Sequence, residues 1–222
     1  MKNLLFLCMT ALVFACTKSP EERAKDMIQE SVKRILYNPE SYDAVSLSID
    51  SAFTPYGSPD FYKQTLKVYE LGTEIRSLRN IEREKKSSME WHSGPYQSSY
   101  DKKTYNEAKE EYDETVAKRE KLEKKVNKMV NELKEQIKAE QQFIGFWAYH
   151  CYRAKNNAGA TQFGEIVFLF NKELNQIVDV YDPSESDFKQ VMMLYMLMQG
   201  RDIELENDAW RIDTDLWDEI WN

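Results

Sequence analysis

The chain has 222 residues, a net charge of −8 from 30 basic and 38 acidic side chains, two histidines and three cysteines. An acidic chain repels phosphate backbones, so nucleic acid is excluded as an expected partner. Clustered zinc ligands, a phosphate-binding loop and a dinucleotide fingerprint are all missing, so we expect no metal and no cofactor. The length suits one domain with an elaboration.

The amino terminus has the features of a targeting segment. Residues 1–16, MKNLLFLCMTALVFAC, contain an apolar core too short to span a bilayer but typical of a signal peptide. The end of the run, Val13-Phe14-Ala15-Cys16, resembles a bacterial lipobox, in which the cysteine sulfur receives diacylglycerol and the signal peptide is cut just before it. Cys8 fits less well, because the preceding Leu7 is bulky.

We therefore predict a lipoprotein signal peptide over 1–15 and lipidation of Cys16. The protein would be lipid-anchored outside the cytoplasm, in the cell envelope at the outer or inner membrane of a Gram-negative bacterium. The alternative is an ordinary signal peptide with a chance cysteine. Once Cys8 is removed and Cys16 is acylated, Cys151 is left alone, so no internal disulfide is expected.

A helix and a strand follow. Ser19-Pro20-Glu21-Glu22 has a capping serine, a proline at the first helical position and a glutamate three residues after the cap. Apolar residues then recur at helical spacing until Asn38-Pro39 ends the helix: Ala24, Met27, Ile28, Val32, Ile35 and Leu36. Residues 41–53 alternate as a strand, with Val45, Leu47, Ile49 and Phe53 on its buried face.

Residues from about 58 to 142 form a long helical insertion. The first arm begins at Ser58-Pro59, and the second runs from about Ser99 to Gln142. Both arms carry residues at the alternating three- and four-residue steps of a coiled-coil seam: Phe61, Val68, Leu71, Ile75 and Leu78, then Tyr105, Ala108, Tyr112, Thr115, Arg119, Leu122, Val126, Met129 and Leu133. We predict an antiparallel hairpin whose tip is residues 87–99.

The stretch 143–181 reads as three consecutive strands joined by short turns. Phe143 to Ala154 has aromatic residues on both faces, which is typical of a central strand that is covered on both sides. Strands around 163–170 and 177–180 follow, so the three form an antiparallel meander that pairs with the strand at 41–53. A helix capped by Ser184 or Ser186 runs to about Gln199.

The predicted fold class is α+β. It comprises an antiparallel sheet of about four strands, flanking N- and C-terminal helices and the inserted helical hairpin. Residues 16–200 make one α+β domain with the insertion at about 58–142, and 201–222 form an acidic, tryptophan-rich tail with eight acids and two arginines.

Two motifs suggest a family. Asn38-Pro39-Glu40-Ser41-Tyr42 and the stretch 150–159, HCYRAKNNAG, together with the tip sequence Ser93-Gly94-Pro95-Tyr96, resemble a group of lipobox-bearing proteins from Bacteroidetes-type bacteria. The resemblance spans roughly residues 30–182. The group has no assigned activity, so the resemblance implies an envelope location and no functional residue.

No catalytic signature is present, and the chain leans away from enzymes. His150 and Cys151 cannot act as a base and nucleophile pair, because neighbours in a strand point to opposite faces. Arg153 and Lys155, before the Asn156-Asn157 turn, could bind an anion or a partner carboxylate. They could equally be a turn that pairs with nearby acids.

Exposed aromatic residues supply the other candidates. Trp91, His92 and Tyr96 lie on the predicted tip, and they either contact a partner or fold back onto the hairpin. Trp217 and Trp221 in the tail either dock on the same chain or meet a partner. Our leading hypothesis is a membrane-anchored interaction module with a partner protein in the envelope. The alternative is a small-ligand or anion-binding protein, or a weakly marked enzyme, with a cleft near Arg153, Lys155 and Tyr152.

Overall fold

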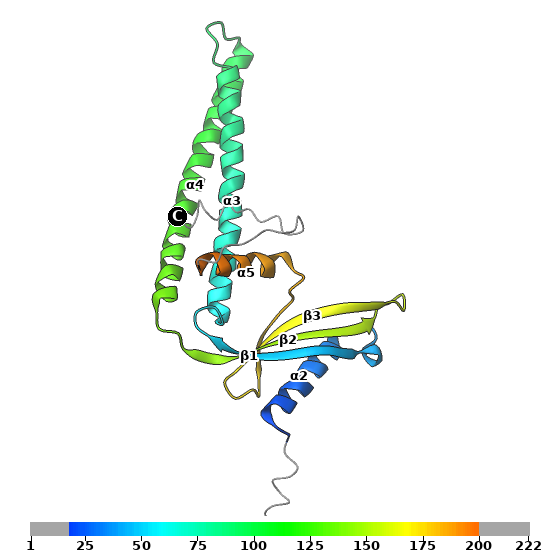
Figure 1. Cartoon of the computed structure of the whole chain (residues 1–222). Helices are drawn as coiled ribbons and strands as arrows, with labels where there is room; N and C mark the ends of the chain where they lie inside the picture. Colours follow the sequence, from blue (N-terminus) through cyan, green and yellow to red (C-terminus); the bar gives the residue numbers. More distant parts are fainter. Residues whose placement is uncertain (1–17, 200–222) are drawn as a thin grey trace, which may run out of the picture. The chain divides into compact units, whose positions relative to one another are not determined.

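The computed structural model describes residues 18–199, and its fold is α+β, as predicted (Figure 1). The signal peptide 1–15, Cys16 and the tail 201–222 lie outside the described residues. The elements in chain order are α2 (Pro20–Ile35), the short 3-10 helix η1 (Pro39–Ser41), β1 (Asp43–Phe53), α3 (Pro59–Trp91), α4 (Ser99–Lys138), β2 (Phe143–Lys155), β3 (Thr161–Phe170), β4 (Ile177–Tyr181) and α5 (Ser186–Met198). Among these elements, no helix is long and apolar enough to cross a membrane.

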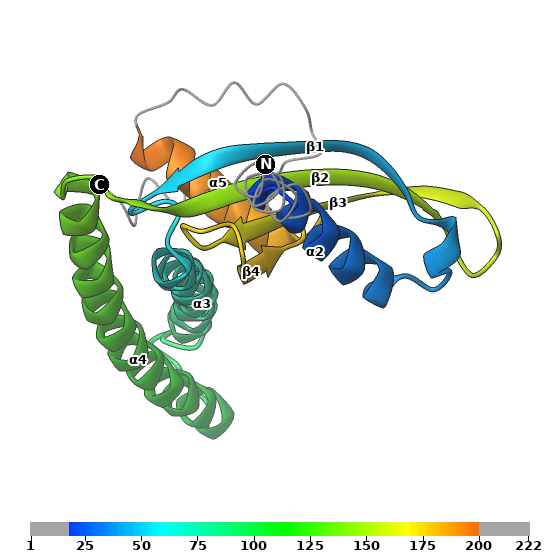
Figure 2. The same ribbon diagram turned by 90° about the horizontal axis from the view of Figure 1, so that it is seen from below.

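The four strands form one antiparallel sheet in the order β1-β2-β3-β4 (Figure 2). The pairing of β1 with β2 closes the sheet across the hairpin insertion, as predicted. Gly145 of β2 has φ +155°, and an added Cβ would lie 1.9 Å from the carbonyl oxygen of Phe170. Only glycine fits this close approach of two strands.

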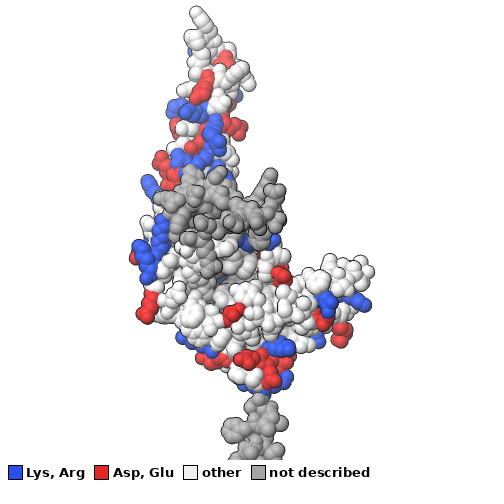
Figure 3. All heavy atoms as spheres, in the orientation of Figure 1, with Lys and Arg blue, Asp and Glu red and all other residues white. Residues whose placement is uncertain are grey.

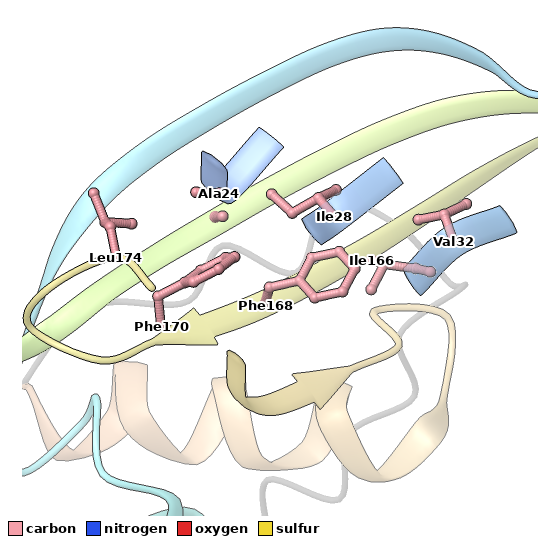
Figure 4. Close-up of a cluster of buried hydrophobic side chains, with 8 residues drawn as sticks. Ala24, Ile28, Val32, Ile166, Phe168, Phe170 and Leu174 are labelled. Atoms are coloured by element: carbon pink, nitrogen blue, oxygen red, sulfur yellow. The ribbon is translucent and has the colours of Figure 1, made fainter. Parts of the chain in front are cut away.

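Helix α2 covers one face of the sheet (Figures 2 and 4). Ser19 caps it through a complete capping box with Glu22, so the predicted start is correct. The side chains that meet between helix and sheet are fully or almost fully buried: Ala24, Ile28 and Val32 from α2, and Ala148, Ile166, Phe168, Phe170 and Leu174 from the sheet and its last turn. Burial of this apolar surface holds the helix on the sheet.

The predicted burial pattern of β1 is wrong at two positions. The register with β2 shifts between Ala44 and Ser46, so Val45 is an extra residue in a bulge and is exposed. A second shift lies between Ala52 and Phe53, and there Ala52 is buried while Phe53 is exposed. The residue added at the first shift, Val45, lies in β1, whereas the residue added at the second shift, Ile144, lies in β2; a strict period of two in the sequence of β1 foresees neither.

The expectation that both faces of β2 are covered is also wrong at Tyr149, in the middle of the strand. Trp147 contacts Tyr181 with ring centroids 5.6 Å apart, but Tyr149 on the same face is exposed. The strand is central, as predicted, because β1 and β3 pair with its two edges.

Residue contacts divide the described chain into two compact units. The first contains residues 18–58 and 141–188, and the second contains residues 59–140 and 189–199. The first unit is therefore the sheet with α2, and the second is the helical hairpin with most of α5.

Within the second unit, α3 and α4 lie side by side as an antiparallel hairpin (Figure 1). On α3 all five predicted seam residues are buried, and Thr65 and Gly72 are buried with them. On α4 only Ala108, Val126 and Leu133 of the nine predicted residues are buried, together with Val130. Near the entry of α3, Phe61 contacts Tyr195 of α5 with ring centroids 5.4 Å apart. Val191, Met193 and Leu194 of α5 are buried as well.

Candidate functional site

The tip of the hairpin is shorter than the sequence predicts. Helix α3 continues to Trp91, α4 begins at Ser99, and only the residues between them form the loop. Ser87 and Ser88 are helical, because nothing before Ser93-Gly94-Pro95 interrupts the helix. At a rise of 1.5 Å per residue, the 33 residues of α3 are about 50 Å long, which is the distance from Pro59 to this loop.

Hydrogen bonds tie the two ends of the loop together. Ser98 caps α4: its hydroxyl accepts from the backbone N–H of Asp101 at 3.1 Å, and its own N–H donates to the Asp101 carboxylate at 3.0 Å. The other oxygen of that carboxylate accepts from Nδ1 of His92 at 2.9 Å. The amide of Gln97 donates to the carbonyl of His92. The loop backbone is thus fixed from both helices.

These bonds also set the ionisation of Asp101. The Ser98 hydroxyl and then the His92 ring stabilise the carboxylate and lower the pKa of Asp101 to about 2. The carboxylate is therefore charged, and accepts, throughout the neutral and mildly acidic range.

Three aromatic rings at the hairpin tip, one in the loop and one in each flanking helix, stand out into solvent. Trp91 is 85% exposed, Tyr96 is 97% exposed and Tyr100, in the first turn of α4, is 69% exposed. Figure 3 shows a mostly white hairpin end, whereas blue and red atoms mix along the arms. Neither Trp91 nor Tyr96 folds back onto the hairpin.

His92 has a different place from its neighbours. It turns inward, where its ring bonds to Asp101 and lies edge-on to Tyr100 with centroids 6.1 Å apart. His92 therefore positions the loop and presents little surface to a partner. The sequence analysis missed Tyr100, whose position just after the loop was the available signal.

The two motifs that carry the family resemblance, in residues 38–42 and 150–159, contact each other in the first unit. The hydroxyl of Tyr42 lies 2.9 Å from Nε2 of His150, and the backbone N–H of Lys155 donates to the hydroxyl of Ser41 at 2.8 Å. Arg153 pairs with Asp43. Three contacts thus join segments more than a hundred residues apart, and these motif side chains serve the closure of the sheet.

His150 is the centre of this junction. Its Nδ1 lies 2.9 Å from the carbonyl of Ser46, which can only accept, so Nδ1 carries the proton and Nε2 accepts from Tyr42. The ring is 3% exposed. Burial lowers the pKa of His150, and this effect is larger than that of the hydrogen bond to Ser46, which raises the pKa. The histidine is a neutral structural group. Cys151 points to the opposite face, as predicted, with its Sγ 3.9 Å from Glu165.

An open groove of about 510 Å³ lies beside Arg153 and Lys155. Glu40 and Asp43 line it as well, so two acids balance the two cations. The groove therefore has no net charge with which to select an anion. Tyr152, which the sequence placed in this cleft, lies on the other face of the sheet, stacked on His150 with centroids 5.9 Å apart.

The remaining predictions concern the tail tryptophans, the lipidated cysteine and metal binding. The predicted interaction residues Trp217 and Trp221 and the lipidation site Cys16 lie outside the described residues. Between residues 18 and 199, no group of three histidine, cysteine or acidic side chains is placed to hold a metal ion. Comparisons with protein-family models, curated proteins and solved structures found no match to this chain.

Proposed function

We propose that this protein is a lipid-anchored interaction module of the cell envelope that binds a partner protein through the hairpin tip. The observation that carries the proposal is the exposure of Trp91, Tyr96 and Tyr100 on and beside a loop that hydrogen bonds hold fixed. The resemblance of residues 13–16 to a lipobox supports the anchor.

Tryptophan and tyrosine dominate the energetic centres of protein interfaces, because each buries a large ring and also offers a hydrogen-bond donor. Burial of such rings in the folded chain would stabilise it, yet here they remain in water. A braced loop also loses little conformational entropy when it binds. Tyrosine and serine, which recur at this tip, and glycine, which occurs there once as Gly94, are common in antibody-like binding loops.

The alternative of an anion site near Arg153 and Lys155 has less support. The groove beside them is open and electrically balanced, and Arg153 is already paired with Asp43.

Site-specific photocrosslinking in native cells tests the tip. A photoreactive phenylalanine analogue replaces Tyr96 in one full-length variant and Tyr37 in a matched control, because Tyr37 is also 74% exposed but lies in the other unit. We expect one discrete protein adduct from position 96 that is weak or missing at position 37. Adding Trp91→Ala to the first variant should lower the adduct yield severalfold, since a tryptophan anchor contributes about 2 kcal/mol or more. Equal adducts at both positions, or none at 96, would refute the tip interface.

The anchor has its own test. Metabolic labelling with a fatty acid should mark the natural chain and a Cys8→Ser variant, but not Cys16→Ser, which should also leave the membrane fraction. Label and membrane association that survive in Cys16→Ser would overturn the lipoprotein assignment.

A further inference from the structure

The hairpin carries a second surface feature, separate from its tip. An open groove of about 820 Å³ lies along the arms, between Gln64 of α3 and the second half of α4. The side-chain amide of Gln136 donates to Gln64 at 2.9 Å, which joins the two arms at one end of the groove. From Gln136 the groove continues past Asn131 and Lys128 to Lys124, a length of about 18 Å along α4.

The helix that lines most of this groove is locally basic. Residues 118–138 of α4 contain eight basic and four acidic side chains, in a chain whose net charge is −8. Lys121, Lys124 and Lys125 are exposed, and within residues 18–199 no hydrogen bond or ion pair engages them. Lys128 forms a loose ion pair, 3.8 Å from Glu132. Positive charge is therefore concentrated at the end of the groove nearer the tip.

The segment that follows α5 has the complementary composition. Residues 201–222 contain eight acidic side chains and two arginines. Near the end of the segment, four apolar residues recur at the spacing of one helix face: Leu216, Trp217, Ile220 and Trp221. Four acids are interspersed with them, between residues 213 and 219. An apolar stripe flanked by acids suits a groove that has lysines along its edge.

The described chain ends within reach of the groove. Most of α5 belongs to the same compact unit as the hairpin, and its Tyr195 contacts Phe61 with ring centroids 5.4 Å apart. Phe61 comes three residues before Gln64, so α5 meets the hairpin at the Gln64 end of the groove. Residues 201–222 span about 70 Å when extended, far more than the length of the groove. The segment can therefore pass from α5 along the groove to the lysines.

We propose that residues 201–222 dock on the hairpin of the same chain, with Trp217 and Trp221 in the groove and the neighbouring acids against Lys121, Lys124 and Lys125. The indole rings pack on the aliphatic stems of the lysines and glutamines and attract the ammonium groups. Because the segment is tethered through α5, its effective concentration at the groove is high. The contact uses none of the tip residues, so it does not depend on the proposed function.

Site-specific photocrosslinking of the full-length protein in native cells tests this contact. A photoreactive phenylalanine analogue replaces Asn131, which is exposed in the groove, or Asn106 in a matched control, which is exposed on the same helix about 37 Å nearer the tip. Trypsin releases residues 212–222 as one peptide, because Arg211 precedes them and no basic residue follows. We expect position 131 to crosslink to this peptide within one chain, and position 106 to give little or none.

The contribution of the rings is measured in the same assay. Adding Trp217→Ala/Trp221→Ala to the position-131 variant should lower the yield of the adduct severalfold, since tryptophan anchors contribute most of the energy of such contacts. An unchanged yield would refute the assignment of these two rings to the groove. Circular dichroism checks the fold of each variant.

The contribution of the charges needs a matched pair of variants. Lys121→Gln/Lys125→Gln should lower the adduct yield at position 131 by about twofold or more, whereas Lys102→Gln/Lys103→Gln, at exposed positions nearer the tip, should leave it unchanged. An equal loss in both variants indicates general charge attraction and would overturn the contact with this part of α4.

The other possible occupants of the groove are outcomes of the same experiment. An adduct of position 131 with a second copy of the chain has twice the monomer mass, and an adduct with another protein contains foreign peptides. Either result in place of the peptide 212–222, equal adducts at positions 131 and 106, or no adduct at 131 would overturn the proposal.

Discussion

Substitution of Tyr42 by phenylalanine isolates the contact that joins the two motifs. The change removes one oxygen, the donor that lies 2.9 Å from Nε2 of His150. His150 is 3% exposed, so water cannot replace the lost donor, and Nε2 becomes an unsatisfied buried acceptor. An unsatisfied buried acceptor lowers the free energy of unfolding by about 1–3 kcal/mol. Phenylalanine no longer buries a hydroxyl, which offsets part of this loss, so we expect a net loss of about 1–2 kcal/mol.

Native-state hydrogen exchange is the suitable assay, because it reports each unit separately. A loss of 1–2 kcal/mol corresponds to a roughly 5- to 30-fold faster exchange of the protected amides in β1 and β2. Amides of α3 and α4 should keep their rates, since the hairpin belongs to the other compact unit.

Tyr37→Phe is the matched control. Tyr37 is 74% exposed, and the loss of its hydroxyl should change stability by less than about 0.5 kcal/mol. If Tyr42→Phe and Tyr37→Phe exchange alike in β1 and β2, the hydrogen bond between the motifs does not contribute to stability, and the structural role assigned to them is refuted.

Three further predictions concern stability. Gly145→Ala should destabilise the sheet by at least about 2 kcal/mol in urea unfolding, because its Cβ would lie 1.9 Å from the carbonyl oxygen of Phe170 at a φ of +155°; a near-neutral result would contradict the close approach. Ser98→Ala should cost about 0.5–2 kcal/mol through loss of the cap and should speed exchange of the tip amides, and unchanged tip exchange would count against the braced loop. Because burial lowers the pKa of His150, its contribution to stability is full above the unfolded pKa of about 6.5 and falls as pH drops below it, with a slope of at most about 1.4 kcal/mol per pH unit; protection factors of β2 amides that stay constant between pH 7 and 5, after correction for intrinsic exchange rates, would disprove this.

The elements that the sequence predicts best are those with local signals. The capping residues at 19–22 and the three- and four-residue steps of the hairpin fix their helices within a few turns of chain, so the start of α2 and the seam of α3 and α4 agree with the structure. The fold class follows, because short turns in 143–181 allow only antiparallel neighbours.

The errors lie where a distant partner decides the local conformation. Val45 becomes a bulge residue because β1 pairs with a strand about a hundred residues later, and the sequence of β1 contains no sign of that register. The junction of Tyr42 with His150 is equally non-local.

The side chains of the two motifs and those of the tip have different roles, because they make different contacts in the folded chain. The motif residues Ser41, Tyr42 and His150 are conspicuous in sequence, yet the polar group of each one makes a hydrogen bond within the sheet unit. The side chains of Trp91 and Tyr96 are exposed and bury little surface in the fold. The hydrogen bonds near them fix the loop backbone instead. Ion pairs between the arms, Arg79 with Glu123 and Arg119 with Glu82, hold α3 and α4 together below the loop. This contrast between a fixed loop and exposed rings is the physical basis of our proposal that the tip presents those rings to a partner.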